Sequence, residues 1–401
     1  MSRSGALRDD DSTLPPEVAK NAALRVLLFL PALERSENQT ATRIAQLLAQ
    51  AASKNRPGTY LYESAPGADA ATILSPNRRP LLKIIQVNYH HALKENPSQS
   101  KNSEFKDAIA GLSFALMGTL RLLHSLLRGQ HFKSGRSTLQ LFYAFALVII
   151  LWLSGLTLVF GAVLSITPNL LPEWLERDTT GGQITQTAGV LGVFVLIYWK
   201  IRAPVLQRGA LLRAVMDYME HHHTVLRATA VLDQAIDDVL ESDPDAEIHI
   251  FGHSFGSIVA LDTLFPTVSD IERRDLAAVH SLTTTGSSVD LLRTLYPDHF
   301  EVRERRCPDI LWTNVFIPAD VLASNFVNTG DDSATAAPNE KRFTIAGAIP
   351  SVNIAVGRPV IRIFRIPTME GITIHGKYWD RNEPRHLERL VPTWLPTPKN
   401  S

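Results

Sequence analysis

The chain has 401 residues and is 45% hydrophobic, which is enough for one large domain or two smaller ones. Lys plus Arg and Asp plus Glu each number 40, so no net charge draws the whole molecule to nucleic acid. The single cysteine, Cys307, excludes an internal disulfide framework and the usual cysteine-based zinc sites.

The part of the chain before residue 136 begins with a polar segment and continues with strands and helices. Residues 1–19 lack the apolar run of a secretory signal, so we expect a disordered segment that stays on the side of the membrane where it is made. Residues 20–135 are predicted to form the first part of a soluble domain. Its expected elements are a buried strand at Leu24–Leu30, a helix at Thr42–Ala52, strands at Thr59–Tyr62 and Lys83–Tyr89, and an amphipathic helix within Phe105–Leu127.

Residues 136–200 are predicted to form a transmembrane hairpin. Leu139–Ile166 is uncharged and apolar on nearly every face, and it is longer than the ~20 residues needed to cross a bilayer. Ile184–Trp199 is shorter and reaches about 24 Å as a helix. Lys and Arg gather outside the two segments, whereas the loop between them holds one Arg, Arg177. We therefore expect a multi-pass protein with two spans, both ends in the cytoplasm and the soluble domain on the cytoplasmic side.

Residues 201–395 are predicted to form the second part of the soluble domain. The alternation of apolar strands and amphipathic helices indicates an α/β fold, with a mostly parallel sheet and helices on both faces. The expected elements are a helix at Thr224–Leu240 with Leu226 and Leu232 on its apolar side, a strand at Glu247–Phe251, a helix at Ser257–Leu264, strands at Ala278–Thr285 and Ile310–Ile317, and a hairpin of Ser351–Ala355 with Val360–Ile366.

The most specific motif follows the strand at Glu247–Phe251. There the sequence reads Gly252-His253-Ser254-Phe255-Gly256, and a predicted helix comes next. In this Gly-x-Ser-x-Gly pattern the serine sits on a sharp strand-to-helix turn, and the glycines let neighbouring backbone pass close by. The turn exposes the serine hydroxyl at the carboxyl end of the strand, where α/β sheets bind ligands. Ser254 is therefore the predicted nucleophile.

With this motif the sequence resembles the α/β-hydrolase superfamily, especially its serine lipases and esterases. The resemblance is specific over Glu247–Leu264 and extends more loosely from Leu24 to Trp379 outside the hairpin. It implies an oxyanion hole made by the N–H of Phe255 and one N–H from the loop after the first strand. Pro31 has no N–H, so the second donor is Ala32 or Leu33. The loop lacks the His-Gly pair of many family members, which leaves the choice open.

The family order implies that an acid and then a histidine follow the nucleophile. Among the later histidines, His375 follows the apolar stretch Gly371–Ile374 and is the expected general base. Asp320 lies just past the strand at Ile310–Ile317 and is the expected orienting acid. The rival histidines are His280, His299 and His386, and the rival acids are Asp290, Asp298, Asp331 and Asp332.

Two charged clusters are given no ligand. His221-His222-His223 occupies consecutive helix positions, which point in different directions and do not converge on one metal ion. Arg303, Arg305 and Arg306 are expected to be exposed charge, which near a membrane can meet anionic headgroups. The expected chemistry requires no metal and no organic cofactor.

These patterns together predict a membrane-anchored serine hydrolase that cleaves acyl esters through Ser254, Asp320 and His375. The anchor favours lipid esters as the substrate class and the bilayer as the partner, with no nucleic acid. The sequence does not indicate the oligomeric state. A thioesterase or acyltransferase would use the same acyl-enzyme, and a catalytically inert hydrolase fold acting as a membrane scaffold or interaction module is the alternative from another class.

Overall fold

The sheet and its covering helices form the part of the chain that the computed structural model describes. That part comprises residues 24–33, 40–54, 60–64, 69–93, 211–267, 276–300, 303–317, 350–356 and 385–395 for the most part, with shorter pieces and single residues such as Asp320, His375 and Tyr378. The strands, in chain order, are β1 (Arg25–Leu30), β2 (Leu61–Glu63), β3 (Ala70–Leu74), β4 (Pro80–Gln86), β5 (Glu247–His253), β6 (Val279–Thr285), β7 (Leu311–Phe316) and β8 (Val352–Ala355). The helices are α1 (Thr40–Ala52), α2 (His90–Leu93), α7 (His222–Ser242), α8 (Phe255–Leu264), α9 (Val289–Leu295), the 3-10 helix η2 (Pro297–Phe300) and α11 (Arg385–Trp394).

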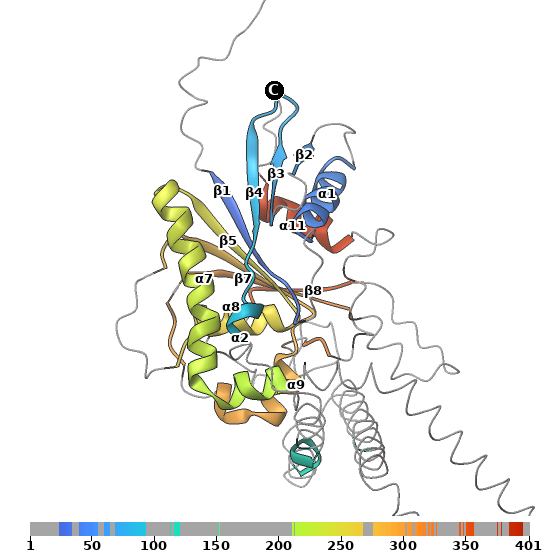
Figure 1. Ribbon diagram of the computed structural model, residues 1–401. Helices are drawn as coiled ribbons and strands as arrows, with labels where there is room; N and C mark the ends of the chain where they lie inside the picture. The colour runs from blue at the N-terminus through green and yellow to red at the C-terminus, as the bar shows by residue number, and fades with distance from the viewer. Residues whose placement is uncertain are drawn as a thin grey trace, which may run out of the picture.

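The eight strands form one mostly parallel sheet in the order β2-β3-β4-β1-β5-β6-β7-β8 (Figure 1). The pairs β4–β1, β1–β5, β5–β6, β6–β7 and β7–β8 are parallel. The pairs β2–β3 and β3–β4, at one edge, are antiparallel. In β1 and β5 every residue after the first is buried, as in strands that are covered on both faces. The prediction of a mostly parallel α/β sheet is therefore confirmed.

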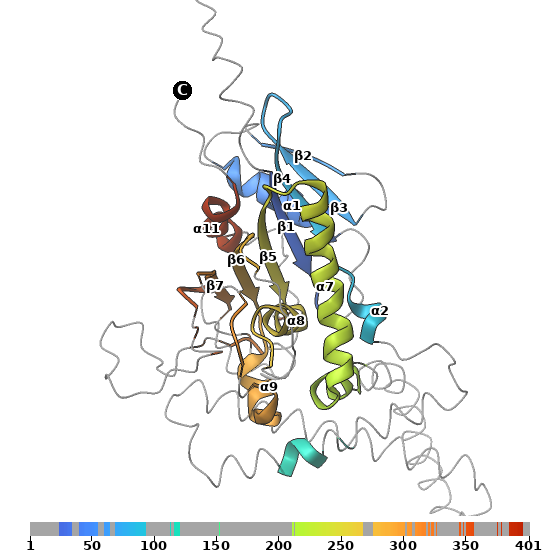
Figure 2. The ribbon, with the colours of Figure 1, turned by 90° about the vertical axis from the view of Figure 1, so that its left-hand side faces the viewer.

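Helices cover both faces of this sheet. Val26, Leu28 and Leu30 of β1 belong to a core cluster with α7 and α8, whereas Leu27 and Phe29 belong to a second cluster with α1 and α11. This alternation follows from the period of two residues along a strand. Figure 2 shows α7 and α11 on opposite sides of the strands. The prediction of helices on both faces is confirmed.

Several boundaries differ from the sequence prediction. The strand expected at Lys83–Tyr89 is β4 and ends at Gln86, because Tyr89 begins the turn into α2. β3 was not predicted, and β8 pairs in parallel with β7, while its expected hairpin partner at 360–366 lies outside the described residues. Leu226 was wrongly placed on the apolar side of α7. It is 42% exposed, because the buried face passes through Ala228, Leu232, Ile236 and Val239.

The predicted membrane hairpin lies almost entirely outside the described residues. Within the described part of the chain, no helix is both long and apolar enough to cross a membrane. Of the first predicted span the structure describes Trp152, whose indole N–H donates to the Thr119 hydroxyl at 3.2 Å. In the stretch expected to be amphipathic, Leu116 and Leu120 are 47% and 58% exposed.

Candidate active site

Ser254 occupies a strained turn between β5 and α8. Its φ of 54° and ψ of −120° lie in a region that residues with a side chain rarely adopt. The Ser254 N–H donates to the carbonyl of Thr285 on the neighbouring strand β6, at 2.8 Å, and this bond holds the turn against the sheet. Strain of this kind is typical of a serine that a strand-to-helix elbow presents for reaction.

The two glycines of the motif are required by close backbone contacts. A Cβ on Gly252 would lie 2.6 Å from the Ser257 Cα, inside the elbow itself. A Cβ on Gly256 would lie 2.4 Å from the carbonyl oxygen of Leu30 and 2.6 Å from that of Pro31. Gly256 therefore lets the first turn of α8 pack directly onto the end of β1 and the loop that follows it.

The elbow lies where the chain direction across the sheet reverses. The strands that follow β1 in the chain, β2 to β4, lie on one side of it, and those that follow β5, β6 to β8, lie on the other side. β1 and β5 are neighbours, with Leu30 opposite Gly252, so their carboxyl ends meet at one edge. In open α/β sheets this reversal leaves the crevice in which ligands bind. Ser254 and the loop after Leu30 thus lie at the same edge of the sheet.

The structure brings Ser254, His375 and Asp320 together. The Nε2 atom of His375 lies 2.7 Å from the Ser254 Oγ, and its Nδ1 atom lies 2.8 Å from the Asp320 Oδ2. In the sequence His375 is 55 positions from Asp320 and 121 positions from Ser254, so these contacts exist only in the folded chain. A nucleophile, a base and an orienting acid within hydrogen-bond distance form the arrangement of a catalytic triad.

The hydrogen bonds define the tautomer of His375. An ionised carboxylate only accepts, so the Nδ1–H of His375 donates to Asp320. The lone pair on Nε2 is then directed at the Ser254 hydroxyl, which donates to it. The imidazole is therefore oriented to remove the serine proton.

Asp320 is 1% exposed and has several donors. The Leu322 N–H donates to its Oδ1 at 3.0 Å, and the Tyr378 hydroxyl donates to its Oδ2 at 2.9 Å. Its loop is fixed to the sheet, because the Asn314 side chain on β7 donates to the Ser324 carbonyl at 2.9 Å. A buried carboxylate that accepts several hydrogen bonds keeps one orientation.

The rival residues lie elsewhere, as far as the structure describes them. His299 bonds to Asp262, and His280 is exposed and bonds to the Ala278 carbonyl. Asp290 lies in α9, and Asp298 lines a cavity apart from the triad. The side chain of His386, and Asp331 and Asp332, fall outside the described residues.

The predicted oxyanion-hole residues belong to two elements that pack together, α8 and the loop after β1. Phe255 is the first residue of α8, so its N–H has no acceptor one turn earlier in the helix. In the loop after β1, the Tyr89 hydroxyl donates to the Pro31 carbonyl and the His90 Nε2–H donates to the Ala32 carbonyl, each at 2.7 Å. In a trans peptide the N–H points opposite to the carbonyl, so these bonds orient the N–H groups of Ala32 and Leu33 as well.

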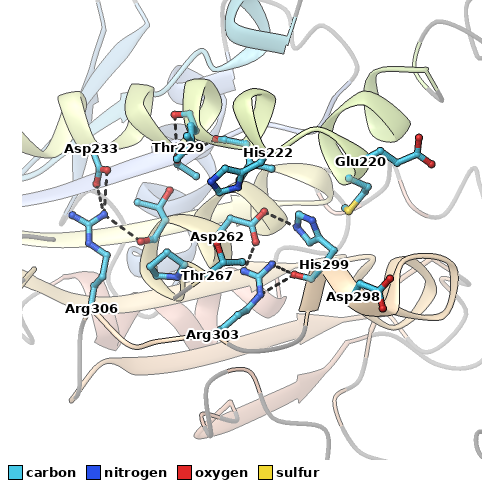
Figure 3. A pocket seen from close by; sticks show the side chains of 15 residues that line it. Glu220, His222, Thr229, Asp233, Asp262, Thr267, Asp298, His299, Arg303 and Arg306 are labelled. Carbon is cyan, nitrogen blue, oxygen red and sulfur yellow. Dashed lines mark hydrogen bonds and ion pairs between the residues drawn. The ribbon is translucent and has the colours of Figure 1, made fainter. Parts of the chain in front are cut away.

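A second polar cluster lies between α7, α8 and η2. The Asp262 carboxylate accepts from Arg303 at 2.5 Å and from His299 at 3.0 Å (Figure 3). It also accepts from the Tyr218 hydroxyl at 2.6 Å, and Arg306 pairs with Asp233 at 2.8 Å. All of these residues except Tyr218 line a cavity of about 420 Å³, and none of the triad residues is among its lining.

The expectation that Arg303 and Arg306 are exposed was wrong. Their side chains are 2% and 11% exposed, because each guanidinium group donates to a carboxylate and to a backbone carbonyl. Burial alone would raise the pKa of the Asp262 carboxyl, but Arg303 and then His299 hold that pKa well below its usual range. Burial and the adjacent Asp262 raise the pKa of Tyr218 well above its usual value. The cluster is thus an ionised network at the C-terminal half of α8.

Sequence reasoning missed four residues that support the site. Tyr89 and His90 follow β4 as two adjacent aromatic residues, and this adjacency was the sign that the sequence offered. In the structure their rings stack with centroids 4.6 Å apart. Tyr378 lies three residues after the expected base, His375. Gly286 follows β6 with a φ of 58°, and a Cβ there would lie 2.8 Å from the Tyr378 ring. No short motif marks these positions, because each acts across the fold.

One family model matches part of the chain. Its description is an alpha/beta hydrolase of unknown function (DUF900), and it matches residues 175–282, which include β5, the elbow and α8. The match ends within β6 and therefore includes Ser254 and Phe255 but neither Asp320 nor His375. No curated protein and no solved structure matches the chain. The sheet is that of an α/β protein and the matched segment is similar to an alpha/beta hydrolase family, and neither finding indicates a substrate.

Proposed function

We propose that the chain is a serine hydrolase that cleaves acyl esters at a membrane surface, with lipid esters as its substrates. The observation that carries the chemistry is the pair of contacts of His375, 2.7 Å to the Ser254 Oγ and 2.8 Å to the Asp320 Oδ2. A catalytically inert hydrolase fold has no need to keep a strained serine, a histidine and a buried carboxylate in this register.

The proposed reaction has two halves. In the first, His375 accepts the Ser254 proton while the Oγ forms a bond to the acyl carbon. The oxyanion accepts hydrogen bonds from the Phe255 N–H and from the N–H of Ala32 or Leu33. The bond to the alcohol oxygen then breaks, and His375 donates its proton to that oxygen. In the second half His375 takes a proton from water, the water oxygen bonds to the acyl carbon, and the Ser254 Oγ leaves with the proton.

The lipid substrate and the membrane location are supported by two apolar features. The uncharged segment Leu139–Ile166 is longer than a bilayer crossing requires. Leu116 and Leu120 lie one helical turn apart on one side of their helix, and both are about half exposed. Exposed leucines on a helix, together with a long apolar segment in the sequence, suit an enzyme whose substrate is drawn from lipid.

The nucleophile is tested by labelling with a fluorophosphonate probe, which reacts covalently with activated serines. Membranes that hold the wild-type chain, Ser254→Ala and the control Ser242→Ala are labelled in parallel. Ser242 is a suitable control because its hydroxyl donates to the Val239 carbonyl at the end of α7, away from the triad. We expect labelling of the wild type and the control only. Equal labelling of Ser254→Ala would exclude Ser254 as the nucleophile, and no labelling of any form would favour the inert scaffold.

Substrate class and location need separate measurements. The purified full chain in detergent is given short soluble esters and phospholipid or acylglycerol esters, and released fatty acid is measured. Cleavage of soluble esters without release from any lipid would contradict the lipid assignment. Extraction of membranes with alkaline carbonate should leave the chain in the pellet, whereas full release into the supernatant would exclude spanning helices.

A further inference from the structure

The Tyr378 side chain reaches the buried end of the triad. Its hydroxyl donates to the Asp320 Oδ2 at 2.9 Å and accepts from the Ile317 N–H at 3.0 Å. Tyr378 is 1% exposed. The hydroxyl therefore links the Asp320 carboxylate to Ile317, the residue after β7.

Packing contacts fix the ring of Tyr378 and therefore the position of its hydroxyl. Gly286 leaves the space on one side, since a Cβ there would lie 2.8 Å from the Tyr378 Cε2. The His253 ring packs edge-on at 5.7 Å, and the His375 ring packs at 6.2 Å and 86°. These contacts place Tyr378 between the elbow, the turn after β6 and the Asp320 loop.

Two donors share one carboxylate oxygen. The Oδ2 of Asp320 accepts from both the His375 Nδ1–H and the Tyr378 hydroxyl. The tyrosine hydroxyl withdraws negative charge from that oxygen, so His375 faces a weaker acceptor than it would with Asp320 alone. The same bond prevents the carboxylate from rotating away from the imidazole.

We propose that Tyr378 is a positioning residue that holds Asp320 in line with His375 and limits the basicity of the imidazole. This inference rests on the proposed hydrolase function. Tyr378 acts through Asp320 and does not touch the reacting atoms, so its removal should change both the rate and its pH dependence.

The test compares Tyr378→Phe with the wild type and with Tyr218→Phe as a matched control. Both variants remove one buried tyrosine hydroxyl that donates to a buried carboxylate, Asp320 in the first and Asp262 in the second. The rate of fluorophosphonate labelling of the full chain in detergent is measured across pH, together with the thermal unfolding midpoint. Among the described residues, the titratable groups that contact His375 are Asp320, Tyr378 and His253, and the test changes only Tyr378.

In Tyr378→Phe we expect the labelling rate at its pH plateau to fall about tenfold, because the carboxylate is no longer fixed. We also expect the midpoint of the acid limb to rise by about half a pH unit, because His375 becomes more basic beside the less stabilised carboxylate. Tyr218→Phe should lower the unfolding midpoint without moving the pH midpoint.

The outcomes separate this inference from the proposed function. If the wild type is not labelled, the hydrolase function itself fails. If the wild type is labelled, and Tyr378→Phe keeps the pH midpoint and loses no more rate than Tyr218→Phe, the positioning role is refuted. If Tyr378→Phe is unfolded at the assay temperature, all three forms are labelled at a lower temperature, below the unfolding midpoint of the variant. An unchanged pH midpoint there would also refute the role.

Discussion

Replacing Gly256 with alanine tests whether the nucleophile elbow and the loop after β1 act as one unit. The added Cβ would lie 2.4 Å from the Leu30 oxygen and 2.6 Å from the Pro31 oxygen. Leu30 is fully buried at the centre of the sheet, so these backbone atoms cannot turn aside. The first turn of α8 and the loop must therefore separate by more than about half an ångström.

This separation has a cost in stability and a larger cost in rate. Overpacking of a filled core destabilises by about 1–3 kcal/mol. The same displacement moves the Phe255 N–H away from the N–H groups of Ala32 and Leu33. Loss of one oxyanion-hole donor costs roughly 100-fold to 1,000-fold in rate, so we expect turnover to fall by about 100-fold or more.

The assay measures ester turnover, the fluorophosphonate labelling rate and the free energy of unfolding of Gly256→Ala. Val259→Ala in the same helix is the control, because Val259 is fully buried and its truncation costs roughly 2 kcal/mol without adding an atom near the loop. The control should keep most of its turnover at a comparable loss of stability. Wild-type turnover in Gly256→Ala would show that the close approach between α8 and the loop does not define the oxyanion hole.

Two further predictions concern buried ionisable side chains outside the triad. Arg303→Met leaves the 2%-exposed Asp262 carboxylate without its closest cationic partner, so the free energy of unfolding in denaturant should fall by about 3–5 kcal/mol, and a loss below about 1 kcal/mol would contradict the described pairing. Burial, then Arg25 and His280, lower the pKa of His249 from its ordinary value of 6.5 to about 4. Between pH 6.5 and about pH 4, His249 is protonated in the unfolded chain but neutral in the folded chain. The free energy of unfolding is therefore highest above pH 6.5 and falls by up to about 3 kcal/mol as the pH drops to about 4. The difference in unfolding free energy between the wild type and His249→Asn, measured from pH 7 to 4, should change by this amount, and a difference that is constant with pH would refute the assignment.

The sequence by itself determined the α/β class, the central strands and the elbow. Apolar runs such as Leu24–Leu30 and Glu247–Phe251 are local signals, because a strand buried on both faces must be apolar along its whole length. The Gly252-x-Ser254-x-Gly256 spacing is also local, since the glycines relieve clashes within a few residues of the serine and with the neighbouring strand. Asp320 and His375 could be chosen from their rivals because each was expected just past a strand end.

The tertiary structure decided what depends on contacts between distant segments. Arg303 and Arg306 looked like surface charge, and only the fold shows that Asp262 and Asp233 reach them across 41 and 73 residues. Tyr378, Gly286, Tyr89 and His90 carry no motif, because a hydroxyl or a missing Cβ matters only against the atoms opposite it. Patterns along the chain record which surfaces must be buried, whereas the partners across a packed interior follow from the relative positions of all the elements.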